Sequence, residues 1–210
     1  MDCQFLCHHL HDLMNKRLVL LDFDGTLTRK DTLFEFIRFY HGSGRYWSGL
    51  MLLSPVLVAF KLKMISGQKV KEIVLKFFFR GEGLETFNAR CSEFAKSVIP
   101  HLIRPSVQLL LSRELAEKSK VVVVSASPEN WVKPWCDTHY LECLATRLEV
   151  IDQKISGKIN GKNCNGAEKA RRIKAAFSLA QFEKIIAYGD THGDREMLQL
   201  AHEAHYRKLS

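Results

Sequence analysis

Asp22 and Asp24, two aspartates separated by one residue, directly follow an apolar run at residues 18–21. Alternate side chains of an extended backbone point to the same side, so the two carboxylates lie close together. Such a pair repels unless a cation or a proton compensates the charge. Gly25 permits a tight turn whose backbone N–H groups can bind an anion. The pattern predicts a turn that binds a cation and an anion; the alternative is a turn that merely joins two elements.

Two further apolar runs, residues 121–124 and 185–188, also end in small or acidic residues. Ser125 follows the first run, and Asp190 and Asp194 follow the second. Continuous apolar runs of this length are typical of strands buried on both faces of a parallel sheet. Because ligands of such sheets bind at the carboxyl ends of the strands, we expect the three ends to form one site. For Asp194, a simple position near a helix N-terminus is the alternative.

The same residues indicate phosphate chemistry. Several carboxylates in one site suit Mg²⁺, which prefers hard oxygen ligands. The hydroxyl of Ser125 can donate to a phosphate oxygen, although serines end many strands. Lys169 lies near the start of a predicted basic helix over residues 166–177 and could neutralise a phosphate or a carboxylate. Each of these two signals is weak by itself. A lysine on a helix, in particular, is usually solvated.

Helical patterns separate the predicted strands and complete an α/β fold with a Rossmann-like parallel sheet core. A hairpin is expected over residues 144–159, with its turn at Asp152 and Gln153. A short last strand closes the chain. Helices are expected from Pro105, from Pro128, over residues 166–177 and over residues 194–201.

Residues 31–101 read as helices throughout, with glycine-containing breaks between them. Leu33, Phe36, Ile37 and Tyr40 share one helical face, and Val70, Ile73, Val74 and Phe77 share another. We expect a helical cap inserted after the first strand, and a core domain of residues 15–30 and 102–210. The preceding leader, residues 1–14, is predicted to be disordered. Its metal-like side chains match no standard zinc spacing, although a metal site there is the alternative: Cys3, Cys7, His8, His9 and His11.

Within the predicted cap, residues 46–60 carry no charged side chain. The run is shorter than the roughly 20 residues that span a membrane, and Pro55 is expected to interrupt it. One interpretation is a buried helix of the cap. The other is a surface that touches a membrane or admits an apolar substrate, with Arg45, Lys61 and Lys63 positioned to meet anionic lipid.

The composition is that of a globular protein, with 46% hydrophobic and 26% charged residues among 210. A formal net charge of +8 favours acidic partners. No basic stripe with interleaved aromatics occurs, so no nucleic-acid partner is expected. Six cysteines without a CxxC pair, and no secretory signal, favour a reduced cytoplasmic location, with peripheral contact at the inner face of a membrane as a further expectation.

Taken together, the motifs resemble the haloacid dehalogenase superfamily, in its phosphatase branch with a helical cap after the first motif. The resemblance covers roughly residues 17–210. The four matching segments follow the order of the family: residues 22–28, 121–125, 163–169 and 188–194.

The resemblance implies a Mg²⁺-dependent phosphomonoesterase in which Asp22 attacks phosphorus and forms an aspartyl phosphate. Asp24 would act as general acid and then general base. Mg²⁺ would bind the carboxylates of Asp22 and Asp190 and the backbone carbonyl of Asp24, with Asp194 acting one layer behind. The phosphoryl group would be held by residues that surround the strand ends: Gly25, Thr26, Ser125, Ala126 and Lys169.

The substrate implied by the resemblance is a phosphorylated small molecule or a lipid phosphate. Phosphoserine phosphatases usually have Glu where Asp31 stands, and Gly-Gly where this chain has Ala126-Ser127. Residues 125–128 and 163–166 look more like bacterial phosphatidylglycerophosphatase C-like proteins. A phosphoserine-like metabolite phosphatase and a phosphotransferase acting on another alcohol remain alternatives. The alternative from another class is a non-catalytic phosphate- or membrane-binding protein. Such a protein would usually have lost Asp22, Asp24 or Asp190, and all three are present here.

Overall fold

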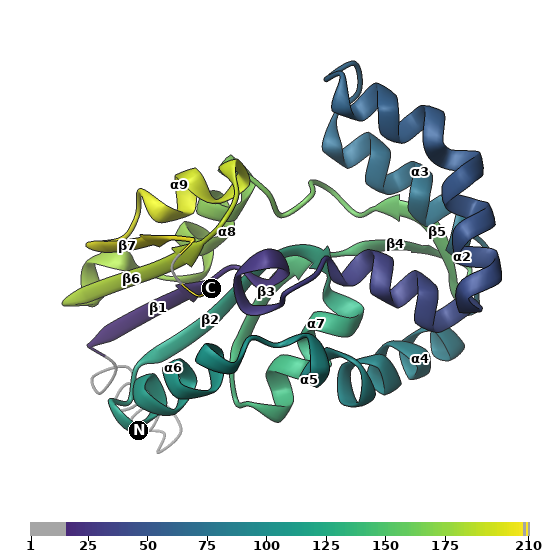
Figure 1. The fold of residues 1–210 in the computed structure, drawn as a ribbon. Helices are drawn as coiled ribbons and strands as arrows, with labels where there is room; N and C mark the ends of the chain where they lie inside the picture. Colours follow the sequence, from purple (N-terminus) through teal and green to yellow (C-terminus); the bar gives the residue numbers. More distant parts are fainter. Residues whose placement is uncertain (1–15, 208, 210) are drawn as a thin grey trace.

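A computed structural model describes residues 16–207 and 209 of the chain. A five-stranded parallel sheet of order β3-β2-β1-β6-β7 forms its centre (Figure 1). β1 lies between β2 and β6, so the three strands with polar ends are neighbours, and the predicted α/β Rossmann-like core is confirmed. The leader at residues 1–14 lies outside the described residues. The strands of the sheet are β1 (Arg17–Leu21), β2 (Lys120–Pro128), β3 (Glu142–Thr146), β6 (Lys184–Gly189) and β7 (Glu203–Tyr206).

The sheet is buried on both faces by helices. Alternate side chains of β1 enter different clusters: Val19 and Leu21 pack with α6 (Pro105–Ala116) and α7 (Glu129–Thr138), whereas Leu18 and Leu20 pack with α8 (Ala167–Ala176) and α9 (Arg195–Leu198). This explains why residues 18–21 form a continuous apolar run. The run makes β1 the rigid central element that carries Asp22.

One strand of the sheet was not expected from the sequence. β3 pairs in parallel with β2, whereas Leu144 was predicted to begin a hairpin. β3 is an edge strand whose first residues are exposed, so it lacks the apolar run that marks the central strands. The hairpin itself is shorter, with β4 (Leu148–Ile151) and β5 (Lys154–Ile159) joined at Asp152 and Gln153. Both turn residues have positive φ, at 47° and 58°.

The C-terminal elements are also shorter than expected. A 3₁₀ turn at His192–Asp194 leads into α9, which ends at Leu198 rather than at residue 201. β7 then forms the predicted last strand.

Helices α2 (Thr32–Lys61), α3 (Gly67–Phe79), α4 (Leu84–Ser97) and α5 (Ile99–Leu102) follow β1, as the predicted cap required. Contrary to expectation, Pro55 does not interrupt α2, whose kink lies at Gly42. Proline deprives the carbonyl four residues earlier of its N–H donor. Here the hydroxyl of Ser54 donates to that carbonyl, Met51 O, at 2.7 Å, which compensates the loss.

The helices of the cap pack around aromatic side chains. The ring of Phe36 stacks on Trp131 of α7 with centroids 4.6 Å apart, so this cluster continues into the core. The hairpin adjoins α3, since the N–H of Gly81 donates to Ile155 O at 2.8 Å. The division of the chain at residues 30 and 102 stays a prediction.

The buried face of α3 differs from the one predicted. Val70 and Val74 are buried as expected, but Phe77 is 41% exposed. The other buried side chains are Leu75, Phe78 and Phe79. The buried face of α3 is therefore rotated about the helix axis relative to the prediction, because β5 and α2 both pack on this side of the helix. In the described part of the chain, no helix has the length and apolarity needed to cross a membrane.

Candidate active site

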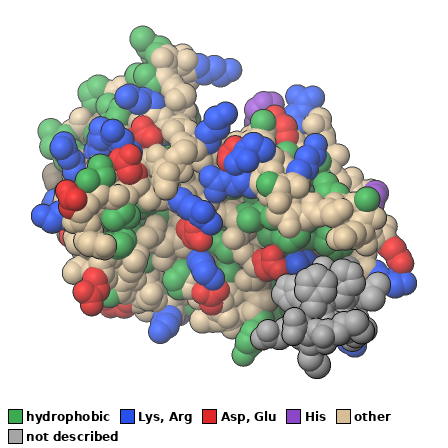
Figure 2. All heavy atoms as spheres, turned by 180° about the vertical axis from the view of Figure 1, so that it is seen from behind, with side chains coloured by type: hydrophobic (Ala, Val, Ile, Leu, Met, Phe, Trp, Pro, Cys, Tyr) green, Lys and Arg blue, Asp and Glu red, His purple; other side chains and the backbone are tan. Residues whose placement is uncertain are grey.

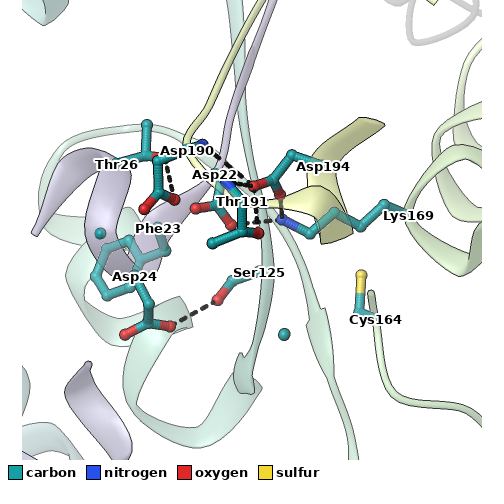
Figure 3. A network of polar contacts seen from close by, with 12 residues as sticks. Asp22, Phe23, Asp24, Thr26, Ser125, Cys164, Lys169, Asp190, Thr191 and Asp194 are labelled. Carbon is teal, nitrogen blue, oxygen red and sulfur yellow. Dashed lines mark hydrogen bonds and ion pairs between the residues drawn. The ribbon is translucent and has the colours of Figure 1, made fainter. Parts of the chain in front are cut away.

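A cavity of about 160 Å³ lies at the carboxyl ends of β1 and β6, and several of its lining side chains are drawn in Figure 3. Core and cap both contribute to its wall. The lining residues are Asp22, Asp24, Asp31, Leu33, Lys71, Ala126, Ser127, Asn165, Lys169, Thr191 and Asp194.

Asp22, Asp190 and Asp194 form an acidic cluster in which one carboxylate oxygen of each lies within 4.8 Å of the others. The parallel pairing of β1 with β6 explains the proximity, since the N–H of Asp22 donates to Tyr188 O at 3.0 Å. Only 6% of Asp22 is exposed. Closely spaced carboxylate oxygens are the ligands that Mg²⁺ prefers, so this donor set fits the ion.

Lys169 is buried in the first turn of α8 and contacts two of these acids. Its Nζ donates to Asp22 Oδ1 at 2.5 Å and to Asp194 Oδ1 at 2.7 Å. Burial alone would lower the pKa of Lys169, but the two carboxylates outweigh burial and raise it, so the side chain stays cationic. The loop before α8 is tied to the turn after β6, because the N–H of Gly166 donates to Gly193 O at 2.8 Å.

The charge of the cluster is not balanced by Lys169 alone. The pKa of Asp22 is raised to about 7, mainly by burial; the charges of Asp194 and Asp24 add to this effect, and Lys169 opposes it. Burial likewise raises the pKa of Asp190. A cation placed between such carboxylates would stabilise their ionised form.

Asp194 organises the loop after β6. Its Oδ2 accepts from the N–H groups of Asp190 and Thr191 at 3.2 and 2.9 Å, and from Thr191 Oγ1 at 2.8 Å. Burial would raise the pKa of Asp194, but Lys169 and the Thr191 donors lower it. Both oxygens are thus engaged in holding Lys169 and the loop; the supporting role of Asp194 behind the metal stays a prediction.

Asp24 points away from the cluster, toward the cap (Figure 3). Its Oδ1 accepts from the N–H and the hydroxyl of Thr32, the first residue of α2, at 2.7 and 2.6 Å. Ser125 Oγ donates to Asp24 Oδ2 at 3.4 Å. Thr32 was not identified from the sequence. Its position next to Asp31, which caps α2 by accepting from Leu33 N, could have indicated that it lies at the start of a helix near Asp24.

The predicted phosphate-binding residues all lie near the cavity, but their hydroxyls have partners within the protein. Thr26 Oγ1 donates to Asp190 Oδ1 at 3.1 Å, and Ser125 Oγ accepts from Ser127 N at 2.9 Å. Gly25 has a φ of 87°, and a Cβ there would lie 2.4 Å from Asp190 Oδ2. Their contacts with phosphate, like those of Ala126, stay predictions.

Two residues of the cavity escaped the sequence analysis as functional residues. Asn165 stands so close to Gly193 that a Cβ on the glycine would lie 2.0 Å from Asn165 Oδ1. Lys71 reaches the cavity from α3. A lysine in a helix gives no local signal of this kind, because its direction depends on which helix face is buried.

The family model of the haloacid dehalogenase-like hydrolases matches residues 19–199, and the chain belongs to this family. Protein CicA of Caulobacter vibrioides is 35% identical over 193 residues, which cover 90% of this chain and 85% of CicA. The sequence-based assignment to a haloacid dehalogenase-type enzyme is therefore confirmed.

Solved structures show the same fold. A protein of unknown function from Bordetella pertussis Tohama I superimposes with a TM-score of 0.77 at 19% identity, covering 90% of this chain and 89% of its own. A phosphoserine phosphatase, solved as an analogue of its phospho-aspartyl intermediate, superimposes with a TM-score of 0.65 at 17% identity, covering 90% and 85%.

Proposed function

We propose that the chain hydrolyses phosphate monoesters through a covalent aspartyl phosphate on Asp22. The observation that carries the proposal is the buried carboxylate of Asp22, which is bonded to Lys169 and lies beside Asp190 and Asp194 at the end of the central strand. Membership of the hydrolase family and the resemblance to a phosphoserine phosphatase fold support it.

In the first step, an oxygen of Asp22 attacks phosphorus as the bond to the ester oxygen breaks, and Asp24 gives that oxygen a proton. In the second step, Asp24 takes a proton from water, the water oxygen attacks phosphorus, and Asp22 is released with inorganic phosphate. The hydrogen bonds from Thr32 support this role, because they hold the Asp24 carboxylate on the side where a leaving group would lie.

Bound Mg²⁺ would supply positive charge that offsets the repulsion between the carboxylate and the phosphate and stabilises the transferring oxygens. Asp22, Asp190 and the backbone carbonyl of Asp24 would hold the ion. Lys169 keeps the Asp22 carboxylate oriented and neutralises part of its charge. The N–H groups near Gly25 and Ala126 would orient the phosphoryl group.

The cap supports a lipid phosphate as the substrate. Hydrophobic side chains along α2 beyond its kink, and in the turn after it, have 46% to 78% of their surface exposed, and Figure 2 shows lysines and arginines among exposed hydrophobic side chains on this part of the molecule. We define this apolar tip by Trp47, Met51, Leu52, Val58, Phe60, Leu62 and Met64. An exposed apolar cluster rimmed by Arg45, Lys61 and Lys63 has the chemistry of a surface that contacts anionic lipid.

The same surface supports peripheral contact with a membrane from the cytoplasmic side. The cysteines of the described residues are unpaired, which agrees with a reducing compartment. The exposure of the tip also disfavours the simpler interpretation of residues 46–60 as a fully buried helix, because only Gly49 and Leu53 are buried there.

The catalytic proposal is tested with Asp22→Asn, measured as phosphate release with Mg²⁺ and as label retained after acid quench of a ³²P-labelled ester. We expect turnover to fall at least about a thousandfold and the covalent label to disappear. Asp137→Asn is the control, since that exposed side chain pairs only with Lys133 at the surface. Retained turnover in a pure Asp22→Asn preparation, with the fold intact by circular dichroism, would refute the covalent route.

A further inference from the structure

Lys71 is a basic side chain of the cap in the wall of the catalytic cavity. It lies on the side of α3 that carries the buried Val70, Val74 and Phe78. Among the cavity-lining residues of the described chain, Lys169 is the other lysine, and its contacts are with Asp22 and Asp194. Lys71 therefore adds positive charge where the cap faces the reacting groups.

The ammonium of Lys71 contacts only uncharged acceptors. Nζ donates to Ala126 O at 2.8 Å and to Asn163 Oδ1 at 3.2 Å. Across residues 16–207, no carboxylate oxygen lies within 4.0 Å of it. A lysine has three N–H donors, so one remains for a further acceptor.

Lys71 is half-buried, and an ammonium partly removed from water without an ionic partner is unfavourable. Burial lowers the pKa of Lys71, although the more distant Asp31 and Asp24 act against this. Buried charges in proteins are normally paired. A substrate anion entering the cavity would provide the missing partner.

α3 is attached to its neighbours by side chains other than Lys71 as well. Gln68 Oε1 accepts from Asn163 N at 3.1 Å, and Glu72 Oε1 accepts from Ile159 N at 3.3 Å. These contacts hold the helix against the end of β5 and the loop that follows it, on either side of Lys71. The lysine is therefore not the sole attachment of α3 in the described part of the chain.

We propose that Lys71 determines specificity by binding a second anionic group on the leaving group of the phosphate monoester. This inference rests on the proposed function and deepens it. In the proposed function, Lys169, the backbone N–H groups of the first turn and the bound cation would hold the transferring phosphoryl group. Lys71 instead belongs to the cap, on the side where Asp24 faces the leaving oxygen.

The second anionic group that Lys71 would bind is a carboxylate or a phosphodiester close to the scissile ester. Both present an anionic oxygen to one ammonium, and neither requires the paired donors of an arginine. A phosphodiester would be supplied by a glycerophospholipid headgroup, and a carboxylate by a soluble phosphorylated acid. The probes below separate these two sources.

The test compares three soluble monoesters with Mg²⁺: sn-glycerol 3-phosphate, 3-phosphoglycerate and deacylated phosphatidylglycerophosphate. We expect Lys71→Met to lower kcat/KM at least about tenfold for one or both anionic leaving groups. The change for sn-glycerol 3-phosphate should stay within about threefold. Lys71→Arg keeps the positive charge and should therefore retain part of the preference for the esters with an anionic leaving group. Lys69→Met, on the exposed side of α3, is the matched control and should change neither ratio.

Binding of the same three esters to Asp22→Asn, with and without Lys71→Met, gives a readout that is independent of turnover. A selective loss of affinity for the anionic esters supports the inference even if the wild type releases no phosphate, in which case only the proposed function fails. Equal losses for all three esters, or no loss, would overturn the role of Lys71 while leaving the phosphatase proposal intact.

Discussion

At the scale of single residues, the site depends on side chains held by more than one partner. Asp194 accepts from Lys169 and Thr191, and Asp24 accepts from Thr32 and Ser125. Multiple contacts restrict each carboxylate to one orientation before substrate arrives, which is the preorganisation that catalysis requires. The candidate nucleophile Asp22 is supported from the core through Lys169, and the candidate acid Asp24 is supported from both the cap and the core.

Gly25 is the residue whose backbone this arrangement constrains most. With φ at 87° and Asp190 Oδ2 only 2.4 Å from a Cβ, Gly25→Ala must displace the carboxylate or the turn. We expect activity to fall at least about tenfold and the Mg²⁺ concentration for half-maximal activity to rise. Both are measured by titrating Mg²⁺ in a phosphate-release assay.

Gly44→Ala is the matched control for that substitution. No atom lies within 4 Å of a Cβ there, and Gly44 lies in the interior of α2. Its activity should remain at the wild-type level. If the Mg²⁺ dependence of Gly25→Ala were unchanged from the wild type, this result would contradict the close approach of the turn to Asp190.

At the scale of elements, the position of Lys169 depends on how α8 begins. Glu168, 8% exposed, accepts from Arg171 Nη2 at 2.7 Å and from Arg172 Nε at 2.9 Å. Arg172 also donates to Ala145 O of β3 at 2.6 Å. The first turn of α8 is thereby tied to the unexpected edge strand, and this contact helps to place the lysine at the cavity.

Glu168→Gln tests that anchor through its pH dependence. Hydrogen bonds from Arg171 lower the pKa of Glu168 to about 2, with Arg172 adding to the effect against burial. A lowered pKa in the folded state stabilises the protein above the ordinary glutamate pKa, and this stabilisation is lost as the pH falls toward 2. We expect the variant to lose about 1–2 kcal/mol of unfolding free energy at pH 7, because Arg171 is largely solvated.

Urea unfolding at pH 7, 5 and 3.5 measures the difference between the two proteins. The difference should be the same at pH 7 and 5 and smaller at pH 3.5. A difference that grows on acidification would contradict the assigned sign.

At the scale of the whole molecule, the catalytic cavity and the apolar tip belong to the same chain of cap elements. α2 begins with Thr32 at Asp24 and ends at Lys61 beside the exposed tip (Figure 1). α3 then returns from the tip to place Lys71 at the cavity. Contact of the tip with a lipid surface would thus be made by the same two helices that approach the leaving group.

Met51→Ser combined with Leu52→Ser tests the tip, since these side chains are 78% and 69% exposed. We expect partitioning onto vesicles of phosphatidylglycerol and phosphatidylcholine to fall at least about tenfold, since each side chain contributes about 1 kcal/mol when part of its surface leaves water. Cosedimentation measures the bound fraction. Turnover of a lipid phosphate in mixed micelles should fall in parallel, while turnover of a soluble ester should not.

Leu109→Ser combined with Leu115→Ser is the matched control, because both residues are exposed on α6 of the core. Vesicle binding by this control should equal that of the wild type. Equal losses in both double variants would indicate a general effect of surface apolarity and would contradict a docking role for the tip.

The sequence by itself determined the central strands and the motifs at their ends. Residues 18–21 are buried on both faces, and such burial leaves a local apolar signature that needs no knowledge of the partner. The turn at Asp152 and Gln153 and the helical nature of residues 32–61 were likewise local. The presence of Asp22 and Asp190 in one site followed from the rule that parallel strand ends meet at one edge, whereas the place of Lys169 there was implied by the family resemblance.

Only the tertiary structure decided which side of each element is used. β3 has little apolar signature, so its pairing with β2 could not be read locally. The buried face of α3, and with it the direction of Lys71, depends on the packing of β5 and α2. Much of the apolar run at residues 46–60 stays exposed because α3 covers only the side that carries Gly49 and Leu53. These features depend on contacts between distant segments, and hydrophobicity along the chain does not encode which of several apolar faces will meet a partner.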